Sequence, residues 1–481
     1  MSTATQIEHE SSPRITAAPV VVALTLLAVL FRFWRLGAKS LWFDEALTAW
    51  LVQAPSHVFT RTIWRGGESN MALYYVIMRA WIHLGSSEWI LRSFSAVTGI
   101  AAVPIFYVLA KRLFGSRVGL VAALLLTVNA CHVAYSQEAR SYALFFLLAI
   151  LSSYFFVRAI TTDSISNYIV YAVISAVAVY THFFALLLVA AQWTSLLALP
   201  REKIPWRKLL LTAILLAVLA SPALFFILGR NTGQLSWVPK PNFRDLQRFG
   251  YFLVADQGTL RQPLLAAYLV LAAVAVVTIF KRRTDEPGAL DKWKVALLVS
   301  WSFLPPTVAF VVSLWKPVFV SRFLIFCLAP LLLLTAAGLA QIRPSWLRHT
   351  LTLVLAAASL VPTFWYYRQP KEQWREAVQY IANHAHPGDS VILFGNYARV
   401  PFEYYRTRVT WAEGVFFIAV SDPTRPAAPH ASPSSWVLIH GDGSDPGAQH
   451  ILPPRYLQKS EAHFFMVTIR LYFSPISQQN P

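Results

Sequence analysis

Cysteine and charge are both scarce in this chain of 481 residues. Its two cysteines, Cys131 and Cys327, lie inside or at the edge of apolar runs. Thiols so few and so placed exclude a disulfide framework and a cysteine-based metal site, and we expect them to pack as small buried apolar residues. Charged residues make up only 13% of the chain, against about 25% in ordinary soluble domains. The low charge therefore argues against a soluble protein.

Hydrophobic residues are abundant where charged residues are few. They make up 56% of the chain, which also holds 17 tryptophans. Runs of about 20 apolar residues recur, and a helix of that length crosses the roughly 30 Å hydrocarbon core with its backbone groups bonded internally. We therefore expect a mainly α, polytopic membrane helical bundle with about eleven crossings. The expected spans are 17–34, 89–109, 118–131, 143–158, 168–180, 183–199, 209–228, 263–280, 295–314, 323–340 and 347–366.

The net charge of +18 is concentrated in short breaks between these spans. Basic residues mark cytoplasmic loops, and a cytoplasmic amino terminus puts all four basic breaks on that side. No basic strip with interleaved stacking aromatics occurs elsewhere, which argues against nucleic acid as a partner. Because residues 168–199 are short for two helices, a single helix there would invert the sidedness of everything that follows. The four basic breaks are 111–117, 201–208, 281–294 and 343–348.

Composition divides the chain into three parts. We expect a cytoplasmic tail at 1–16, a membrane module at 17–366 with a long first external loop at 36–88, and a small extracytoplasmic α/β domain at 367–481. Amphipathic patterns predict interfacial helices at 42–52 and 72–84 and a helix at 371–381. Strands are expected at 390–394, 436–440 and 464–473, and a surface loop at 427–435.

Two adjacent acids, Asp44 and Glu45, follow the first apolar span directly after Trp42 and Phe43. Carboxylates beside a bilayer are costly to desolvate, so this pair indicates chemistry at the lipid boundary. A solvated loop with two charges is the alternative.

Polar residues also gather in a second outer break, at 135–142, which contains Glu138 and Arg140. Arg79, Arg92 and Arg322 lie near other helix ends that are expected on the same side. A guanidinium suits a lipid phosphate, because its planar donors pair with phosphate oxygens while its stem lies along apolar surface. Snorkelling of each arginine to the interface is the competing interpretation.

Six motifs together resemble the bacterial membrane glycosyltransferases of the dolichyl-phosphate-mannose-protein mannosyltransferase type (glycosyltransferase family 39 type), within the GT-C superfamily. The resemblance covers most of the chain and extends to the tail, through Trp374-Arg375 and 387–389. One departure is the segment 68–72, where relatives commonly have a Pro-Pro pair, and it puts the acceptor or sugar part of the first loop in question. The motifs are Leu41-Trp-Phe-Asp-Glu-Ala46, Leu73-Tyr-Tyr75, Leu91-Arg-Ser93, Ser136-Gln-Glu-Ala-Arg-Ser-Tyr-Ala143, Tyr180-Thr-His-Phe-Phe184 and Pro317-Val-Phe-Val-Ser-Arg-Phe323.

The resemblance implies transfer of a sugar from a polyprenyl-phosphate carrier to an acceptor lipid, glycan or protein outside the cytoplasm of a bacterial cell (inner) membrane. It implies Asp44 as the general base and Arg140 and Arg322 as ligands of the carrier phosphate. Arg92 would assist at the phosphate, and Tyr74, Tyr75, Glu138 and His182 would line the donor or sugar pocket.

Elementary mechanism agrees with these roles. An inverting transfer needs one carboxylate to accept the proton of the attacking hydroxyl and a cationic environment for the departing phosphate. Glu45 is expected to orient Asp44, pair an arginine or bind a cation. No cofactor is required; a divalent cation could use oxygen ligands here, but no local metal-binding spacing occurs, and hydrogen bonding is the expected role of His132 and His182.

Two other classes remain open at this stage. A polyprenyl-lipid flippase or transporter would use the same arginines and carboxylates, although such proteins tend to show internal repeats and helices broken at the midplane. The Asp44 loop has no repeat in the second half of the chain, and the polar residues lie at helix ends. A binding or assembly protein that acts through its tail is the third possibility.

Overall fold

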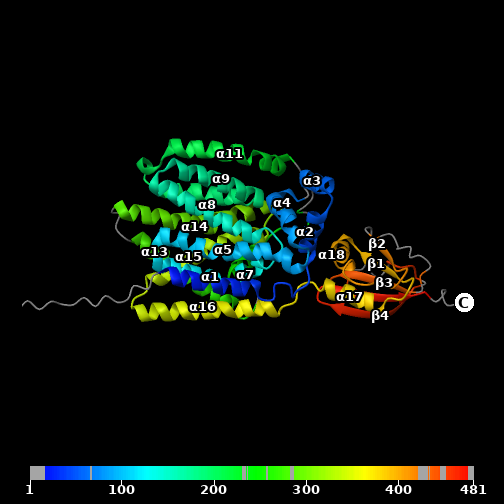
Figure 1. Ribbon diagram of the computed structural model, residues 1–481. Helices are drawn as coiled ribbons and strands as arrows, with labels where there is room; N and C mark the ends of the chain where they lie inside the picture. Colours follow the sequence, from blue (N-terminus) through cyan, green and yellow to red (C-terminus); the bar gives the residue numbers. More distant parts are fainter. Residues whose placement is uncertain are drawn as a thin grey trace, which may run out of the picture.

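The structure is a computed structural model that describes residues 17–65, 68–229, 235, 237–255, 258–281, 286–420, 432, 434–444, 451–454 and 456–474. A bundle of long, roughly parallel helices is joined at one end to a smaller unit built on a sheet (Figure 1). The prediction of a mainly α membrane bundle with a small C-terminal α/β unit is confirmed. The expected tail at 1–16 lies outside the described residues.

Each expected span coincides with a helix of the bundle. In the described part of the chain, seven helices are long and apolar enough to cross a membrane, and α6 with α7, bent by 60° between them, could form an eighth. Three further apolar helices are shorter, so the number of crossings stays a prediction. The bundle helices are α1 (Ala17–Phe33), α5 (Glu88–Phe114), α6 (Ser116–Val128), α7 (Ala130–Ser136), α8 (Tyr142–Thr162), α9 (Ile165–Thr181), α10 (Ala185–Ser195), α11 (Trp206–Gly229), α13 (Arg261–Lys281), α14 (Glu286–Ser313), α15 (Leu328–Ala340) and α16 (Ser345–Arg368).

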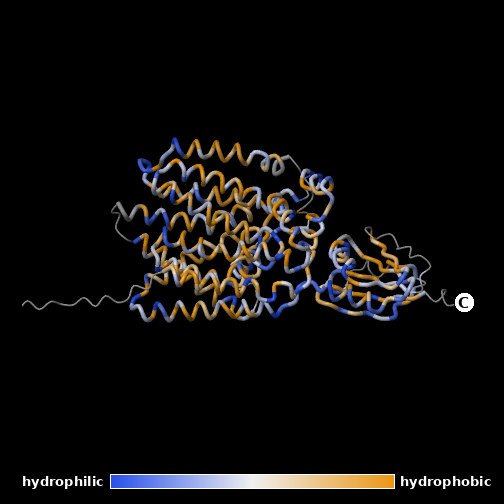
Figure 2. Tube along the Cα trace, viewed as in Figure 1, coloured by the Kyte–Doolittle hydropathy of each residue, from blue (hydrophilic) through white to orange (hydrophobic). Residues whose placement is uncertain are grey.

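The hydropathy of the bundle agrees with this arrangement. Apolar residues run along the helices, whereas polar residues gather at their ends and in the sheet unit (Figure 2). The segment 168–199 forms two helices, α9 and α10, separated at His182.

The long first loop is folded into helices that lie between the bundle and the sheet unit (Figure 1). The predicted helices at 42–52 and 72–84 are confirmed as α2 (Phe43–Gln53) and as α4 (Ala72–Trp81) with η2 (Ile82–Leu84). Pattern reasoning missed α3 (Ser56–Trp64) and the short η1 (Ser69–Met71). Other short elements are η3 (Leu196–Ala198), η4 (Arg201–Lys203), the amphipathic α12 (Phe243–Val254) and η5 (Ser321–Cys327).

The C-terminal unit is a mixed five-stranded sheet with the order β2-β1-β3-β5-β4. Strand β1 is an inner, fully buried strand that pairs in parallel with β2 and β3, whereas β5 runs antiparallel to β3 and β4. The elements are α17 (Trp374–His384), β1 (Ser390–Phe394), α18 (Asn396–Arg406), β2 (Phe416–Val420), β3 (Ser434–His440), β4 (Leu457–Phe464) and β5 (Val467–Phe473).

The predicted strands at 390–394 and 436–440 are confirmed. The prediction of one strand over 464–473 is wrong, because the chain turns at Phe465-Met466, where Met466 has a φ of 60°. The helix expected at 371–381 begins later, at Trp374. Most of the loop expected at 427–435 lies outside the described residues, and its last two residues start β3.

A close approach of α5 and α7 positions the second polar break. A Cβ on Gly99 of α5 would lie 2.1 Å from the Ser136 hydroxyl, so only glycine allows this packing distance. Gln137 then anchors the chain after α7 by donating to the carbonyls of Phe31, Arg32 and Trp34 at the end of α1. Residues 138–141 are thereby held beside the first loop.

Candidate active site

The site begins at the first turn of α2, which carries Asp44 and Glu45. Acidic residues are favoured there because the backbone N–H groups at a helix N-terminus are unpaired and partly positive. Successive residues of a helix point in different directions, and the two acids accordingly have different surroundings. Glu45 is completely buried, whereas 14% of the Asp44 side chain is exposed.

Glu45 forms a two-pronged ion pair with Arg92 of α5. The Arg92 Nε and Nη2 atoms lie 2.7 Å from the two Glu45 oxygens, and the backbone N–H of Ala139 donates to Glu45 Oε1 over 2.9 Å. Burial alone would raise the pKa of Glu45, but the charges of Arg92 and Lys371, with these hydrogen bonds, hold it below its usual range. Glu45 is therefore an ionised residue with both oxygens occupied.

The guanidinium of Arg92 is also fully hydrogen-bonded within the protein. Its Nη1 donates to the carbonyls of Leu36 and Lys39, and its Nη2 also donates to Ser40, so every nitrogen of the guanidinium has a protein partner. A phosphate would have to displace one of these partners. In this structure Arg92 joins α5 to the start of the first loop, which differs from the donor-phosphate role that the resemblance implies.

Asp44 lies between the two other predicted arginines. Its Oδ2 is 3.2 Å from Arg322 Nη2 and 3.9 Å from Arg140 Nη2, and Arg140 Nη1 also donates to the Asp44 carbonyl over 3.3 Å. The three residues come from the first loop, the break before α8 and the first turn of η5, far apart in sequence. The structure thus brings together the three residues for which the resemblance implies the roles of base and phosphate ligands.

Aromatic rings surround Arg322. Its guanidinium carbon lies 5.3 Å from the ring centre of Trp42 and 5.2 Å from that of Trp237, within cation–π range. Among the described residues, the Nε atoms of Arg322 and Arg140 are buried without a hydrogen-bond partner. Unpaired charged donors in such a place favour an anionic ligand, because an unsatisfied buried donor is costly.

Tyr75 links the arginines to the altered part of the loop. Its hydroxyl accepts from Arg140 Nη1 over 2.9 Å and donates to Glu68 Oε2 over 2.6 Å. Glu68 belongs to the segment that departs from the family pattern, so the departure lies next to the site. Tyr74 is buried behind Tyr75, with its hydroxyl 3.3 Å from that of Ser95. It makes no hydrogen bond to Asp44, Arg140 or Arg322.

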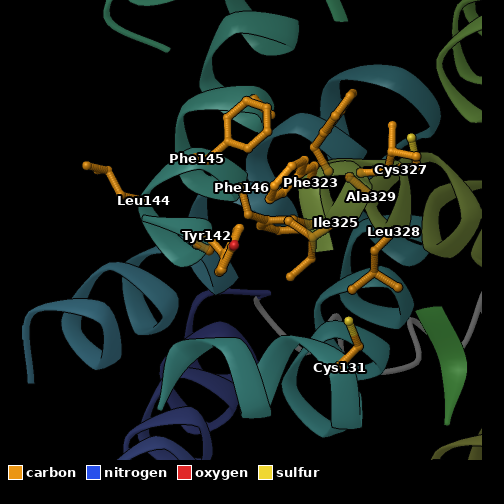
Figure 3. Packing of buried hydrophobic residues seen from close by; sticks show 14 of the residues in the cluster. Cys131, Tyr142, Leu144, Phe145, Phe146, Phe323, Ile325, Cys327, Leu328 and Ala329 are labelled. Carbon is orange, nitrogen blue, oxygen red and sulfur yellow. The ribbon is translucent and has the colours of Figure 1, made fainter. Parts of the chain in front are cut away.

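His182 lies in an aromatic wall behind Arg322. Its ring stacks on Phe145 with centres 5.2 Å apart and packs against Phe323 at 4.9 Å; Phe145, Phe323 and Tyr142 lie close together in Figure 3. Burial, with the charges of Arg140 and Arg322, lowers the pKa of His182 to about 3, so the imidazole is neutral. Its Nδ1 accepts from the backbone N–H of Phe184 over 3.3 Å, which leaves a hydrogen on Nε2.

The Nε2 of His182 and the hydroxyl of Tyr142 have no hydrogen-bond partner in the described part of the chain. They add two neutral donors to the unpaired arginine nitrogens. His132, the other histidine weighed from the sequence, instead accepts a hydrogen bond at its Nδ1 from Arg32 Nη2 over 2.8 Å within the bundle. Cys131 and Cys327 are both buried members of the apolar core, as predicted, and Figure 3 shows Cys327 beside Ala329.

Glu138 belongs to the Glu45 cluster. Lys371 places its ammonium 2.9 Å from Glu138 Oε1 and 3.5 Å from Glu45 Oε2, so it bridges the two carboxylates. Over the residues that the structure describes, no group of three or more His, Cys, Asp or Glu side chains is arranged to hold a metal ion. Lys371 follows the last bundle helix and was not singled out from the sequence.

A cavity of about 460 Å³ opens beside Trp42. Its walls are mostly apolar and come from α7, α12 and α16, while Lys371 and Glu372 supply charge at one side. The tip of the β4–β5 hairpin, Phe465 and Met466, closes part of the rim. The shape and lining suit a ligand with an apolar chain and a polar end.

The sequence of this region matches a known family. Residues 69–226 match the family model described as dolichyl-phosphate-mannose-protein mannosyltransferase. That stretch contains Tyr75, Arg140 and His182, and the match confirms the resemblance that the motifs predict. None of the curated proteins compared with the chain matches it.

Solved structures share the architecture of the chain. The oligosaccharyltransferase of Archaeoglobus fulgidus, in its apo form, is 12% identical with a TM-score of 0.55, over 89% of this chain and 70% of that one. The chain has the GT-C fold. The oligosaccharyltransferase AglB from Archaeoglobus fulgidus, in complex with an inhibitory peptide and a dolichol-phosphate, gives 12% identity and a TM-score of 0.53, over 88% and 69% of the two chains. ArnT from Cupriavidus metallidurans bound to undecaprenyl phosphate gives 15% identity and a TM-score of 0.46, over 95% and 98%.

Within this GT-C fold, sequence reasoning missed four residues beside the site: Glu68, Trp237, Lys371 and Glu372. The sequence did indicate the location of two of these residues, Lys371 and Glu372. Lys371 and Glu372 follow a predicted membrane span directly, so the topology already placed them at the level of the Asp44 loop. Trp237 and Glu68 lie in loops whose path the pattern of hydropathy does not determine.

Proposed function

We propose that this protein is an integral membrane glycosyltransferase. It transfers a sugar from a polyprenyl-phosphate donor to an acceptor lipid, glycan or protein outside the cytoplasm, with inversion at the anomeric carbon. The observation that carries the proposal is the placement of Asp44 between Arg140 and Arg322, whose buried Nε atoms have no partner among the described residues. The family match and an oligosaccharyltransferase relative solved with a dolichol-phosphate support it.

The two arginines would hold the phosphate. A phosphate monoester leaves with two negative charges, and two guanidinium groups compensate them with hydrogen bonds as well as charge. The aromatic rings around Arg322 and the burial of Arg140 limit the access of water, which strengthens each interaction. The Nε2–H of His182 and the hydroxyl of Tyr142 would donate to the phosphate or to the sugar.

Asp44 would act as the base. The acceptor oxygen forms a bond to the anomeric carbon while the bond from that carbon to the phosphate oxygen breaks, and the hydroxyl proton passes to Asp44. A bound phosphate competes with Asp44 for Arg322, so the ion pair seen at 3.2 Å loosens and Asp44 becomes a better proton acceptor. The leaving phosphate needs no proton, and a second acid is unnecessary.

Glu45, Arg92 and Lys371 would form the frame of the site. Their buried ion pairs join α2 to α5, to the 138–141 segment and to the chain that leaves α16. The apolar cavity beside Trp42 would admit the lipid carrier from the bilayer. We place this active face and the C-terminal sheet unit outside the cytoplasm of the bacterial cell membrane.

The test uses sealed vesicles that contain the purified protein, polyprenyl-phosphate mannose as the first donor and a cell-envelope extract as acceptor. We expect a new glycosidic bond and an equal amount of free polyprenyl phosphate, with the product anomer opposite to that of the donor by NMR. Other polyprenyl-phosphate sugars replace mannose if it is not transferred. Movement of labelled lipid across the bilayer with no new glycosidic bond from any donor would instead identify a flippase.

A further inference from the structure

The N-terminus of α2 has no cap of its own. The residue before the helix is Trp42, whose side chain makes no capping hydrogen bond, although Ser, Thr, Asp or Asn usually fills this position. The backbone N–H of Phe43 donates instead to Glu372 Oε2 over 3.1 Å. Glu372 lies more than 300 residues away, just after the last bundle helix. A remote carboxylate thus caps the helix that carries Asp44.

Glu372 is itself held in place by the C-terminal unit. The indole N–H of Trp374, a completely buried residue, donates to Glu372 Oε2 over 2.7 Å. On the other side, His440 Nε2 of β3 lies 3.5 Å from Glu372 Oε1, and its ring is parallel to that of Trp374 with centres 6.0 Å apart. The carboxylate has little freedom to turn away from α2.

Helix α18 of the same unit holds the neighbouring residues. The ring of Tyr397 stacks on Phe43 with centres 3.8 Å apart, and the hydroxyl of Tyr405 accepts from the backbone N–H of Leu41 over 2.6 Å. Residues 41–43 therefore have three contacts with the part of the chain that follows the membrane bundle. The direction in which the side chain of the next residue, Asp44, points depends on all three contacts.

A local cap could not replace Glu372. A serine at position 42 would accept from the backbone N–H of Asp44 or Glu45, because an N-cap side chain bonds to the second or third residue of its helix. It would leave the Phe43 N–H without the partner that Glu372 provides, and it would not tie α2 to the sheet unit.

We propose that Glu372 is a positioning residue for sugar transfer. It fixes the first turn of α2 and so aims the Asp44 carboxylate, which makes the C-terminal unit a working part of the active site. This inference rests on the proposed function of Asp44. It assigns the sheet unit a task that does not depend on which acceptor is used.

Three variants of the full-length protein in lipid nanodiscs test the inference. Glu372→Ala removes the cap, Glu372→Gln keeps an oxygen that can accept the Phe43 N–H, and Glu403→Ala removes a half-exposed acid of α18 that pairs only with Arg406 within its own helix. We expect Glu372→Ala to lower kcat about 10- to 100-fold, the scale of a small misplacement of a catalytic group, with the donor KM changed less than about threefold. Glu372→Gln should recover most of this loss, and Glu403→Ala should have no effect.

Hydrogen–deuterium exchange of the 41–53 peptide supplies a measurement that does not depend on activity. Exchange should be faster in Glu372→Ala and unchanged in the other two variants. If the alanine variant does not fold, Glu372→Asp, which shortens the side chain by one methylene, should show the same two effects more weakly.

Two outcomes would overturn the proposal. One is faster exchange of α2 with unchanged kcat, and the other is a glutamine variant as defective as the alanine variant. Failure of the proposed function is distinguishable, because it would show as full activity of Asp44→Asn whatever the behaviour of Glu372.

Discussion

Glu45 and Arg92 are joined by two hydrogen bonds of 2.7 Å, and neither side chain is more than 2% exposed. Asp44, one residue earlier, keeps 14% of its side chain exposed and lies beside two arginines with unpaired nitrogens. The adjacent acids therefore have different surroundings, and we propose separate tasks for them. Glu45 would stabilise the frame of the site, while Asp44 would act on the substrate.

Replacing Arg92 by lysine should destabilise the protein. Lysine cannot make two parallel hydrogen bonds to Glu45 or reach the three carbonyls that Arg92 also holds, and disruption of a buried ion pair costs about 3–5 kcal/mol. Thermal unfolding in nanodiscs measures the loss. Arg248→Lys, at an exposed ion pair with Asp245, is the matched control and should cost less than about 0.5 kcal/mol. Equal stability of the Arg92 variant and the wild type would contradict this account of the pair.

Lys39 should make the stability of the protein depend on pH near neutrality. Burial, with the positive charges of Lys371 and Arg92, lowers the pKa of Lys39 from 10.5 to about 7. Between these two values the unfolded chain binds more protons than the folded one, so stability should rise as the pH increases from 7 towards 10. The unfolding midpoint measured at several pH values should show this rise. Lys39→Gln should flatten it, and an identical slope in both proteins would refute the assignment.

The sequence predicted that the outer breaks lie on one side of the membrane, and the structure brings three of their charged residues together. Topology placed Asp44, Arg140 and Arg322 on that side along with Arg79 and Arg92, the resemblance selected the first three, and Asp44 lies within 4 Å of both arginines. Hydropathy predicted only the shared side, since apolar spans fix which loops share a membrane surface. It could not decide which acid pairs with which arginine, because that depends on the rotation of α2 and the path of residues 36–40.

Other parts of the fold follow from tertiary contacts that leave no local pattern. The turn at Phe465-Met466 lies in the unbroken apolar run Phe464-Phe-Met-Val467, which contains no Gly, Pro, Asn or Asp, so the two strands β4 and β5 could not be separated. The cap of α2 comes from Glu372, and no rule about local spacing connects residues that far apart. Arg92 shows the converse: the resemblance implies a phosphate ligand, and no local pattern indicated that its nitrogens bond to Glu45 and to three backbone carbonyls.

Arg140 and Arg322 should both be required for binding of the carrier. Replacing either by lysine keeps the charge but removes the planar pair of donors, and each lost charge-assisted hydrogen bond should weaken binding of undecaprenyl phosphate about 10- to 100-fold. Fluorescence titration in nanodiscs measures the affinity. Arg348→Lys, at the other end of the bundle, serves as the control. Unchanged affinity for undecaprenyl phosphate in both variants would mean that these arginines do not bind the carrier phosphate.

The C-terminal sheet unit should be reachable from outside the cell. Ser444, in an exposed turn after β3, can be replaced by cysteine as a labelling site, and Lys203, in the exposed η4, supplies a matched position on the side expected to be cytoplasmic. The native cysteines are buried and should react slowly. A membrane-impermeant maleimide added to spheroplasts should label Ser444→Cys and leave Lys203→Cys unlabelled. The reverse pattern would mean that the topology is inverted.

The central claim is that Asp44 accepts the proton of the attacking hydroxyl. Its most direct test is the single-turnover rate of sugar transfer by Asp44→Asn, measured in nanodiscs together with the affinity for undecaprenyl phosphate, with Asp163→Asn at the opposite end of the bundle as control. We predict a loss of about 100- to 10,000-fold in the transfer rate, with carrier affinity equal to or above that of the wild type because Arg322 no longer pairs with a carboxylate. A transfer rate close to that of the wild type would contradict the account.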